Sequence, residues 1–293
     1  MFLELIKLVR VKQWVKNLFV FAPLIFDEKF TDVNAFFAAM LTFVSFCLLS
    51  SVVYIVNDIY DRVGDRQHPL KNKRPLAAGV ISLKSAWLLD FLLLCGVCLT
   101  LFFQSLSTSL VLLLYLFLNL LYSGFCKHLV IIDVLIIATG FVLRVVAGAC
   151  AIGVSVSNWM FLVTFFLSLF IGFAKRRHEL YLMDGLEGEF RAVLHKYSTT
   201  FCDALVTVCL GLTIITYSLY TVDPQVIARL QSDKLIYSLP MVIYGLFRYL
   251  YLLYEKHDGE LTEVLFRDRG LQMAILLWLI FVLGLIYSTA VFA

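Results

Sequence analysis

Polar side chains gather at the point where the second long apolar run of the chain ends. Three carboxylates, those of Asp58, Asp61 and Asp65, follow Asn57 within eight residues. If a helix continues through this segment, four polar side chains share one of its faces: Tyr54, Asn57, Asp61 and Asp65. Carboxylates this close repel one another unless a cation lies among them. The cluster therefore predicts a metal site.

The chemistry of these ligands favours one metal. Hard oxygen ligands that leave coordination positions open suit magnesium bridging a diphosphate better than zinc or a redox metal. The alternative is a solvated helix end, in which Asp61 and Arg66 form an ordinary surface ion pair. The cluster begins where the helix would leave the hydrocarbon, and this position favours the metal site.

A short basic loop follows the carboxylates. It carries Lys71, Lys73 and Arg74, and Pro69 and Pro75 stiffen it. Such a loop could hold phosphate oxygens over a metal ion. The alternative is a loop that is attracted only to anionic lipid headgroups. Its place directly after the carboxylates favours phosphate binding.

Further cations border other apolar runs, and Arg144 lies inside one. Lys16, Lys127 and the basic stretch at 175–177 each lie at the end of a run. Arg144 follows Asp133 by eleven residues, which is about 16 Å of helix. An intramembrane charge usually faces a bundle interior or a polar cavity, and an anionic substrate would explain it. Pairing with Asp133 or Asp90 is the structural alternative.

The composition shows which elements must position these residues. The chain has 293 residues, of which 61% are hydrophobic and 15% charged, and its mean hydropathy is +0.91. One soluble core could not enclose this much apolar surface, so the bilayer must be the solvent. The net charge of only +3 gives a nucleic-acid partner no support.

Nine apolar runs reach the length of about 20 residues that is needed to cross a membrane. Their residue numbers are about 13–30, 33–56, 83–103, 106–124, 131–152, 157–174, 199–220, 235–254 and 271–291. Backbone polar groups must be paired inside lipid, and the runs lack the alternation of barrel strands. We therefore expect an all-α, polytopic membrane protein that forms a single transmembrane domain over residues 1–293.

The basic residues predict the orientation of these spans. Of the 24 lysines and arginines, all but four border the same side of the membrane. The exceptions are Lys29, Arg229 and Lys234 on the other side and Arg144 within a span. The positive-inside rule then places the N-terminus and the long polar loops in the cytoplasm. We expect a multi-pass protein of the inner (cytoplasmic) membrane with its functional site on the cytoplasmic face.

At this point the sequence resembles the UbiA superfamily of intramembrane prenyltransferases. That family has a nine-helix bundle with an Asn-Asp-x-x-Asp motif on the second helix and a tyrosine–lysine motif on the fourth. Here Asn57, Asp58 and Asp61 match the first motif, and Tyr122 with Lys127 matches the second. The closer resemblance is to the branch of decaprenyl-phosphate phosphoribosyltransferases. Six ordered segments carry it: residues 13–17, 57–66, 68–75, 122–127, 140–148 and 174–177.

The resemblance implies an Mg²⁺-dependent transfer of 5-phosphoribosyl from phosphoribosyl diphosphate to a polyprenyl phosphate, with release of diphosphate. It implies Asn57 and Asp61 as metal ligands, and Asp61, Asp58 and Asp65 as catalytic carboxylates. The substrate-binding residues it implies are Lys16, Tyr54, Arg66, Lys71, Arg74, Tyr122, Lys127, Arg144, Lys175, Arg176 and Arg177. The oligomeric state does not follow from the sequence.

One departure from ordinary UbiA prenyltransferases favours phosphoribosyl transfer over prenyl transfer. Those enzymes usually carry a second aspartate-rich motif after the sixth helix, where this chain has Lys175, Arg176 and Arg177. A basic stretch suits a substrate with more bare phosphate. The alternative of the same fold is prenyl transfer from a prenyl diphosphate to an aromatic acceptor. A membrane transporter is the alternative of another class, but its polar residues should lie near the bilayer midplane rather than at one face.

Overall fold

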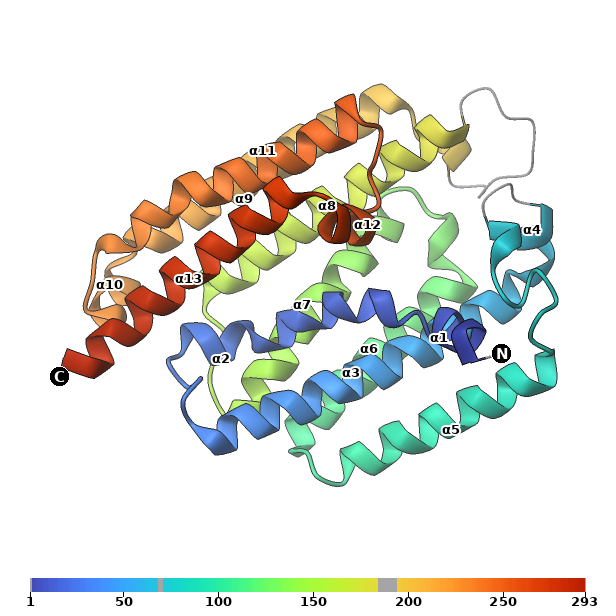
Figure 1. Ribbon diagram of the computed structural model, residues 1–293, viewed down its shortest axis with the longest axis horizontal. Helices are drawn as coiled ribbons and strands as arrows, with labels where there is room; N and C mark the ends of the chain where they lie inside the picture. The colour runs from blue at the N-terminus through green and yellow to red at the C-terminus, as the bar shows by residue number, and fades with distance from the viewer. Residues whose placement is uncertain (1, 68–70, 184–193, 293) are drawn as a thin grey trace. The chain divides into compact units, whose positions relative to one another are not determined.

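The computed structural model describes residues 2–67, 71–183 and 194–292, and within these ranges it is built from helices without a strand. The expected all-α class is confirmed. The chain groups into two compact units (Figure 1). The first contains the described residues of Met1–Leu24, Lys29–Ser155 and Gly185–Lys196, and the second those of Ile25–Glu28, Val156–Asp184 and Tyr197–Ala293. A single domain over 1–293 stays a prediction.

The first unit holds five long or medium helices and several short ones. In chain order these are α1 (Phe2–Val9), the 3-10 helix η1 (Val11–Phe21), α3 (Val33–Tyr60), α4 (Arg62–Gln67), η2 (Lys71–Lys73), α5 (Leu83–Leu101), α6 (Leu106–Gly124), η3 (Cys126–His128), α7 (Ile132–Ile152) and η4 (Leu194–Lys196). The helix α2 (Ala22–Phe26) contributes residues to both units. Helices α3, α5 and α6 begin after Asp32, Ser82 and Ser105, whose side chains accept hydrogen bonds from backbone N–H groups of the first turn.

The second unit is built in the same way. Its helices are α8 (Asn158–Met183), α9 (Thr199–Val222), α10 (Pro224–Leu230), η5 (Lys234–Ser238), α11 (Leu239–Glu255), α12 (Leu261–Arg267) and α13 (Arg269–Phe292). Helices α8 and α9 pack along each other, and α11 packs against α13. The apolar core of this unit includes Tyr217, Leu230, Leu235 and Val282.

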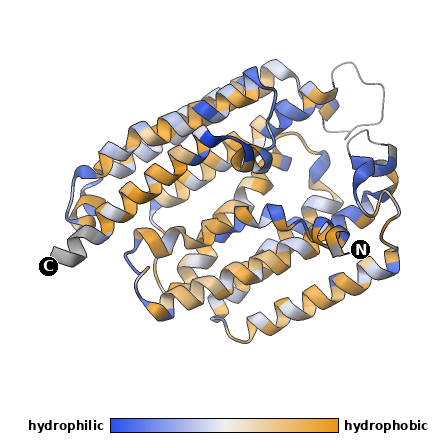
Figure 2. Cartoon of the chain, in the orientation of Figure 1, coloured by the Kyte–Doolittle hydropathy of each residue, from blue (hydrophilic) through white to orange (hydrophobic). Residues whose placement is uncertain are grey.

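Among the described residues, eight helices are long and apolar enough to cross a membrane: Val33–Tyr60, Leu83–Leu101, Leu106–Gly124, Ile132–Ala151, Asn158–Met183, Thr199–Val222, Lys234–Glu255 and Arg269–Tyr287. They match the second to ninth predicted spans. Figure 2 shows hydrophobic residues along most of their length and hydrophilic residues concentrated at ends such as α4. The chain is therefore an integral membrane protein.

The first predicted span, at about 13–30, has a different structure. Residues Val11–Phe21 form a 3-10 helix, and Pro23 lies in the short α2 that follows. A 3-10 helix rises about 2.0 Å per residue, so the 11 residues of η1 reach about 22 Å where an α-helix would reach about 16 Å. The segment is divided into helices of 11 and 5 residues, and neither alone reaches the length of about 20 residues of a membrane-spanning α-helix.

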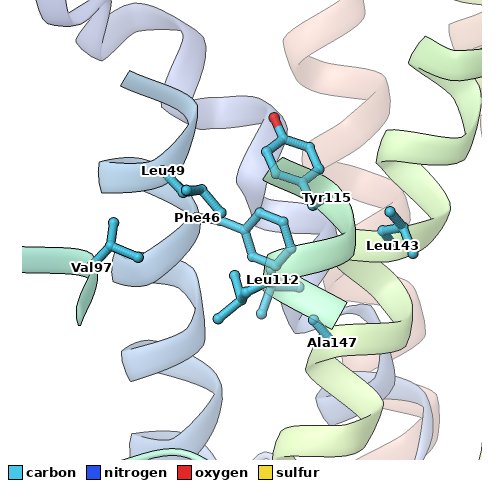
Figure 3. Packing of buried hydrophobic residues seen from close by; sticks show 8 residues of the cluster. Phe46, Leu49, Val97, Leu112, Tyr115, Leu143 and Ala147 are labelled. Carbon is cyan, nitrogen blue, oxygen red and sulfur yellow. The ribbon is translucent and has the colours of Figure 1, made fainter. Parts of the chain in front are cut away.

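The core of the first unit gathers side chains from η1, α3, α5, α6 and α7 (Figure 3). Phe46 of α3 is fully buried, and its ring meets the Tyr115 ring edge-on with 5.1 Å between centroids. Leu112, Leu143 and Ala147 close the cluster. Lipid tails are as apolar as these side chains, so close packing rather than the hydrophobic effect holds such helices together.

A glycine allows the closest of these contacts. A Cβ atom on Gly148 of α7 would lie 2.0 Å from the backbone oxygen of Val20 in η1. Small residues at such crossings let membrane helices approach closely. The glycine therefore fixes η1 against α7, and with it Asn17 and Lys16 one turn earlier.

We expect Gly148→Ala to destabilise the protein by about 1–3 kcal/mol, because the added methyl meets backbone that cannot turn away. Gly140→Ala on the same helix is the control. A Cβ there meets the Tyr115 ring at 3.5 Å, an ordinary contact. Thermal unfolding in detergent measures both. An unchanged midpoint in Gly148→Ala would contradict the tight packing of η1 on α7.

Candidate active site

The predicted carboxylate cluster lies at a break between α3 and α4. Asp61 follows the last residue of α3 with φ −84° and ψ 0°. The backbone N–H of Asp61 donates to Asn57 O at 2.9 Å, and that of Asp65 donates to Asp61 O at 2.8 Å. The helical hydrogen bonding thus continues across the break, as the sequence predicts, although the helix is not uniform there.

Asn57, Asp61 and Lys127 form one contact group at this break. The Asn57 amide donates to Asp61 Oδ2 at 3.1 Å, and Lys127 Nζ lies 2.7 Å from Asp61 Oδ1. The Asp61 side chain keeps 26% of its surface exposed. Lys127 comes from η3, in a turn that ends at Ile131 with φ +69°, a conformation that is strained for a β-branched residue.

Asp58 and Asp65 belong to a second contact group with two arginines. Asp58 Oδ1 accepts from Arg10 at 2.5 Å and from Arg74 at 2.9 Å. Arg74 also donates to Asp65 Oδ2 at 2.7 Å. The Asp58 and Asp65 side chains are only 2% and 7% exposed. Two buried carboxylates thus balance two arginines, as buried charges require.

The separation of the carboxylates into two contact groups decides which side chains fit a metal ion. No group of three or more His, Cys, Asp or Glu side chains in the described part of the chain could hold a metal by itself. Magnesium, however, is usually bound through one or two carboxylates, and substrate phosphates and water complete its shell. Asn57 and Asp61 fit this mode, since they are partly exposed and adjacent. Asp58 and Asp65 are occupied by arginines.

Arg10 belongs to the second contact group through Asp58, and the sequence did not single it out as a candidate site residue. It has φ +56°, between α1 and η1, and its guanidinium lies over the Tyr54 ring at 4.8 Å. We counted it only as one of the basic residues that set the orientation. Arg10 lies three residues before the first of the six segments that carry the family resemblance, residues 13–17, and this position was the available signal.

Arg144 lies deep in α7, as expected, but its partners are neutral. It is 5% exposed. Its guanidinium donates to Asn17 Oδ1 at 2.8 Å, to Gly140 O at 2.8 Å and to the Tyr115 hydroxyl at 2.9 Å. The Phe46, Tyr115 and Phe141 rings lie within 5.5 Å of it. Neither Asp133 nor Asp90 forms an ion pair with it among the described contacts. Among the described contacts, the positive charge of Arg144 is therefore compensated by dipoles and aromatic rings.

The other predicted substrate ligands of the first unit border the same segments. Arg66 is exposed, and its Nε donates to the Ala77 backbone oxygen at 3.1 Å, which ties α4 to the basic loop. Lys16, Lys71 and Tyr122 are half-buried and have interactions with other groups. His68 and Pro69 lie outside the described residues.

The basic stretch after residue 174 belongs to the second unit and is paired with acids. Lys175 lies 3.0 Å from Glu260, Arg176 lies 2.5 Å from Glu179 and Arg177 lies 3.0 Å from Asp203. The Arg177 guanidinium also stacks 3.9 Å from the Tyr254 ring centroid. From the sequence, the positive charge of this stretch indicated a substrate with bare phosphate. In the fold, acidic side chains largely balance that charge. The acidic residues that follow this basic stretch in the sequence, Asp184, Glu187 and Glu189, lie outside the described residues.

Comparison with known proteins identifies the family. The sequence pattern of the UbiA prenyltransferase family matches residues 20–278. The chain belongs to this family. The match includes the Asn57–Asp61 and Lys127 contact group and the whole of α3 to α7.

Curated relatives of this UbiA chain extend over nearly its full length. Decaprenyl-phosphate phosphoribosyltransferase of Mycolicibacterium smegmatis is 31% identical over 287 residues, which cover 94% of this chain and 90% of the relative. The enzyme of the same name from Corynebacterium glutamicum is 32% identical over 303 residues, 98% of this chain and 88% of the relative.

Solved structures agree on the UbiA fold. A UbiA homolog from Archaeoglobus fulgidus bound to GPP and Mg²⁺ has a TM-score of 0.69 at 18% identity and covers 97% of this chain and 98% of its own. The same homolog bound to DMAPP and Mg²⁺ has a TM-score of 0.68 at 19% identity, over 96% and 98% of the two chains. At this identity the likeness concerns the fold alone.

Proposed function

We propose that the protein transfers the 5-phosphoribosyl group of phosphoribosyl diphosphate to the phosphate of a membrane polyprenol. In this reaction the bond between sugar C1 and the diphosphate oxygen breaks, and diphosphate leaves with the electron pair. An oxygen of the lipid phosphate forms the new bond to C1. The observation that carries the proposal is the match over 94% of the chain to a decaprenyl-phosphate phosphoribosyltransferase.

The contact groups of the first unit suit such a donor. Asn57 and Asp61 would hold Mg²⁺, which neutralises charge on a leaving diphosphate. Lys127, 2.7 Å from Asp61, would contact the same phosphates. Arg10 and Arg74 are oriented by buried Asp58 and Asp65, and their remaining N–H groups would bind further phosphate oxygens.

The remaining ligands extend this assignment. Lys16, Tyr54, Arg66, Lys71, Tyr122 and Arg144 would bind the phosphates and ribose of the donor. Arg144 is held by neutral acceptors and rings rather than by a carboxylate among the described contacts, which supports an anionic substrate beside it. Lys175, Arg176 and Arg177 would bind lipid phosphate or the 5-phosphate only if the substrate displaced their carboxylate partners.

The chemistry needs little from general acid–base groups. A phosphate nucleophile is already ionised at neutral pH, so no base has to remove a proton. Catalysis then rests on fixed cations around the leaving diphosphate and on alignment of lipid phosphate with sugar C1. A carboxylate and amide pair surrounded by arginine and lysine supplies this environment.

We also propose that the site faces the cytoplasm, where phosphoribosyl diphosphate is soluble. The bias of lysines and arginines to one side supports this orientation in an inner membrane. Cysteine labelling of Lys73→Cys in intact and broken cells would test it. Labelling of this cysteine in intact cells by an impermeant reagent would show that the site faces the outside.

The activity is tested by mass analysis of products. Purified protein is incubated with Mg²⁺, phosphoribosyl diphosphate and a C50 or C55 polyprenyl phosphate. We expect a lipid whose mass has increased by one phosphoribosyl group, together with free diphosphate. Consumption of a prenyl diphosphate with an aromatic acceptor, and none of phosphoribosyl diphosphate, would instead assign prenyl transfer.

A further inference from the structure

A groove lies between α11 and α13 of the second unit. It has a volume of about 560 Å³. Its walls are mostly apolar, and the lining residues are Pro240, Met241, Tyr244, Arg269, Gly270, Met273, Ala274 and Leu277. Both helices belong to membrane spans. The Met273 and Leu277 side chains are 53% and 47% exposed, so the groove opens toward the surroundings of the span.

Polar groups converge at one end of this groove, around Gly270. A Cβ on Gly270 would lie 3.1 Å from both the Tyr244 hydroxyl and Arg248 Nε, and 3.2 Å from Asp268 Oδ1. The absence of a side chain at Gly270 therefore lets these three groups lie against the start of α13. The other end of the groove, near Met241 and Leu277, is apolar.

The charges at the polar end do not cancel. Arg248 donates to both oxygens of Asp268, at 3.1 and 2.7 Å, and this holds the pKa of the Asp268 carboxyl below its usual range. Asp268 Oδ1 also accepts from the Leu271 N–H at 2.7 Å. Asp268 is thus fully compensated. Arg269 beside it is exposed and joins no ion pair within the described ranges, which leaves one net positive charge.

The length of the groove fits an amphiphile. Arg269 is the first residue of α13, and Leu277 lies eight residues further, about 12 Å along the helix. Arg269 therefore stands at the end of the span, where headgroups lie, and Leu277 lies within the hydrocarbon. A cation at the headgroup level above an apolar trough matches the layout of a lipid with an anionic head.

We propose that this groove binds one membrane phospholipid, with its phosphate at Arg269 and the Tyr244 hydroxyl and with an acyl chain along Met273, Ala274 and Leu277. A helix of a second copy would leave Arg269 without an acceptor unless it brought a carboxylate to the same level. Every phospholipid carries a phosphate at that depth. The site is independent of the transferase reaction and would hold α11 against α13.

Matched variants on α13, together with one at the end of α12, test the site. Arg269→Gln removes the cation, and Arg267→Gln removes an arginine that is 73% exposed and near Asp258 and Glu263. Met273→Trp fills the groove. Leu276→Trp places the same ring on α13 at a position of similar exposure, 49%, which does not line the groove. All four changes lie on exposed positions and leave the core intact.

The measurement is native mass spectrometry of detergent-purified full-length protein with added phosphatidylglycerol. We expect a retained one-lipid adduct in the unmodified protein, a loss of at least about fivefold in Arg269→Gln and Met273→Trp, and no loss in Arg267→Gln and Leu276→Trp. Size-exclusion elution checks that each variant is folded. Unchanged adducts in Arg269→Gln and Met273→Trp overturn the proposal.

Two other results would also overturn the phospholipid proposal, and each would identify a different occupant of the groove. If C55 polyprenyl phosphate forms the adduct that these variants lose while phosphatidylglycerol does not, the groove belongs to the acceptor lipid. If Met273→Trp abolishes the mass of a dimer, the groove is a contact between two copies of the chain. A failed transferase assay would leave the lipid measurement unaffected.

Discussion

Asp61→Asn is expected to remove nearly all turnover, by about 100-fold or more, while the protein still folds in detergent. Removal of one preorganised charge from a site that stabilises a leaving group typically costs this much. Asp61 is the one carboxylate of the cluster that is partly exposed and adjacent to Asn57. The change keeps the size of the side chain and its contact with Lys127 but removes the charge that a magnesium ion needs. Turnover at saturating substrates measures the effect.

Asp27→Asn is a closely matched control. Asp27 also has a side chain that is 26% exposed and pairs with a cation, Arg229, at 3.1 Å. It lies in the second unit, and we expect full activity for this variant. Full activity in Asp61→Asn as well would show that Asp61 does not bind the metal.

Asp58→Asn is expected to destabilise the protein and to weaken donor binding. Loss of this charge leaves Arg10 without its carboxylate partner and Arg74 with Asp65 alone. Loss of hydrogen bonds between charged groups typically costs about 1.5–3 kcal/mol. The arginines would then no longer be held in place, so the KM for phosphoribosyl diphosphate should rise. Because Asp58 is occupied by arginines rather than metal, the Mg²⁺ concentration for half-maximal activity should not change. Thermal unfolding and a magnesium titration measure the two effects.

Glu4→Gln serves as the control for the stability effect. It removes an exposed pair with Lys7 at 2.6 Å, and exposed pairs contribute about 0–1 kcal/mol. If Asp58→Asn kept its unfolding midpoint and instead raised the magnesium requirement several-fold, Asp58 would be a metal ligand. The cluster would then act as one site rather than as two contact groups.

The sequence predicted the membrane spans and the gathering of carboxylates at the end of α3, because apolar length and the end of a helix are local properties. The sequence could not show that the carboxylates fall into two contact groups, Asp61 with Asn57 and Lys127, and Asp58 and Asp65 with two arginines. The prediction placed Asp65 on the face of Asp61, but Arg74 draws Asp65 and Asp58 together at 2.7 and 2.9 Å. Arg10 reaches Asp58 across 48 positions of sequence. Contacts at such separations depend on how the helices pack, which no local pattern contains.

Arg144 and the basic stretch at 175–177 show the same limit. A charge in the apolar layer suggested a carboxylate partner or an anionic substrate, yet the structure supplies Asn17 and Tyr115, 127 and 29 positions away. The sequence of the basic stretch, taken without its partners, predicted a phosphate-binding site. Glu260 and Asp203, which neutralise two of its cations, come from segments far along the chain.

The contact of Gly148 with Val20 has a consequence for how the protein is made. The N-terminal segment η1 cannot take its native position until α7 has emerged, because both Gly148 and Arg144 belong to its docking surface. At about 5–20 residues per second, this is roughly 6–25 s after Val20 is synthesised. The segment that carries Lys16 and Asn17 can therefore reach its packed position only after most of the first unit has been synthesised.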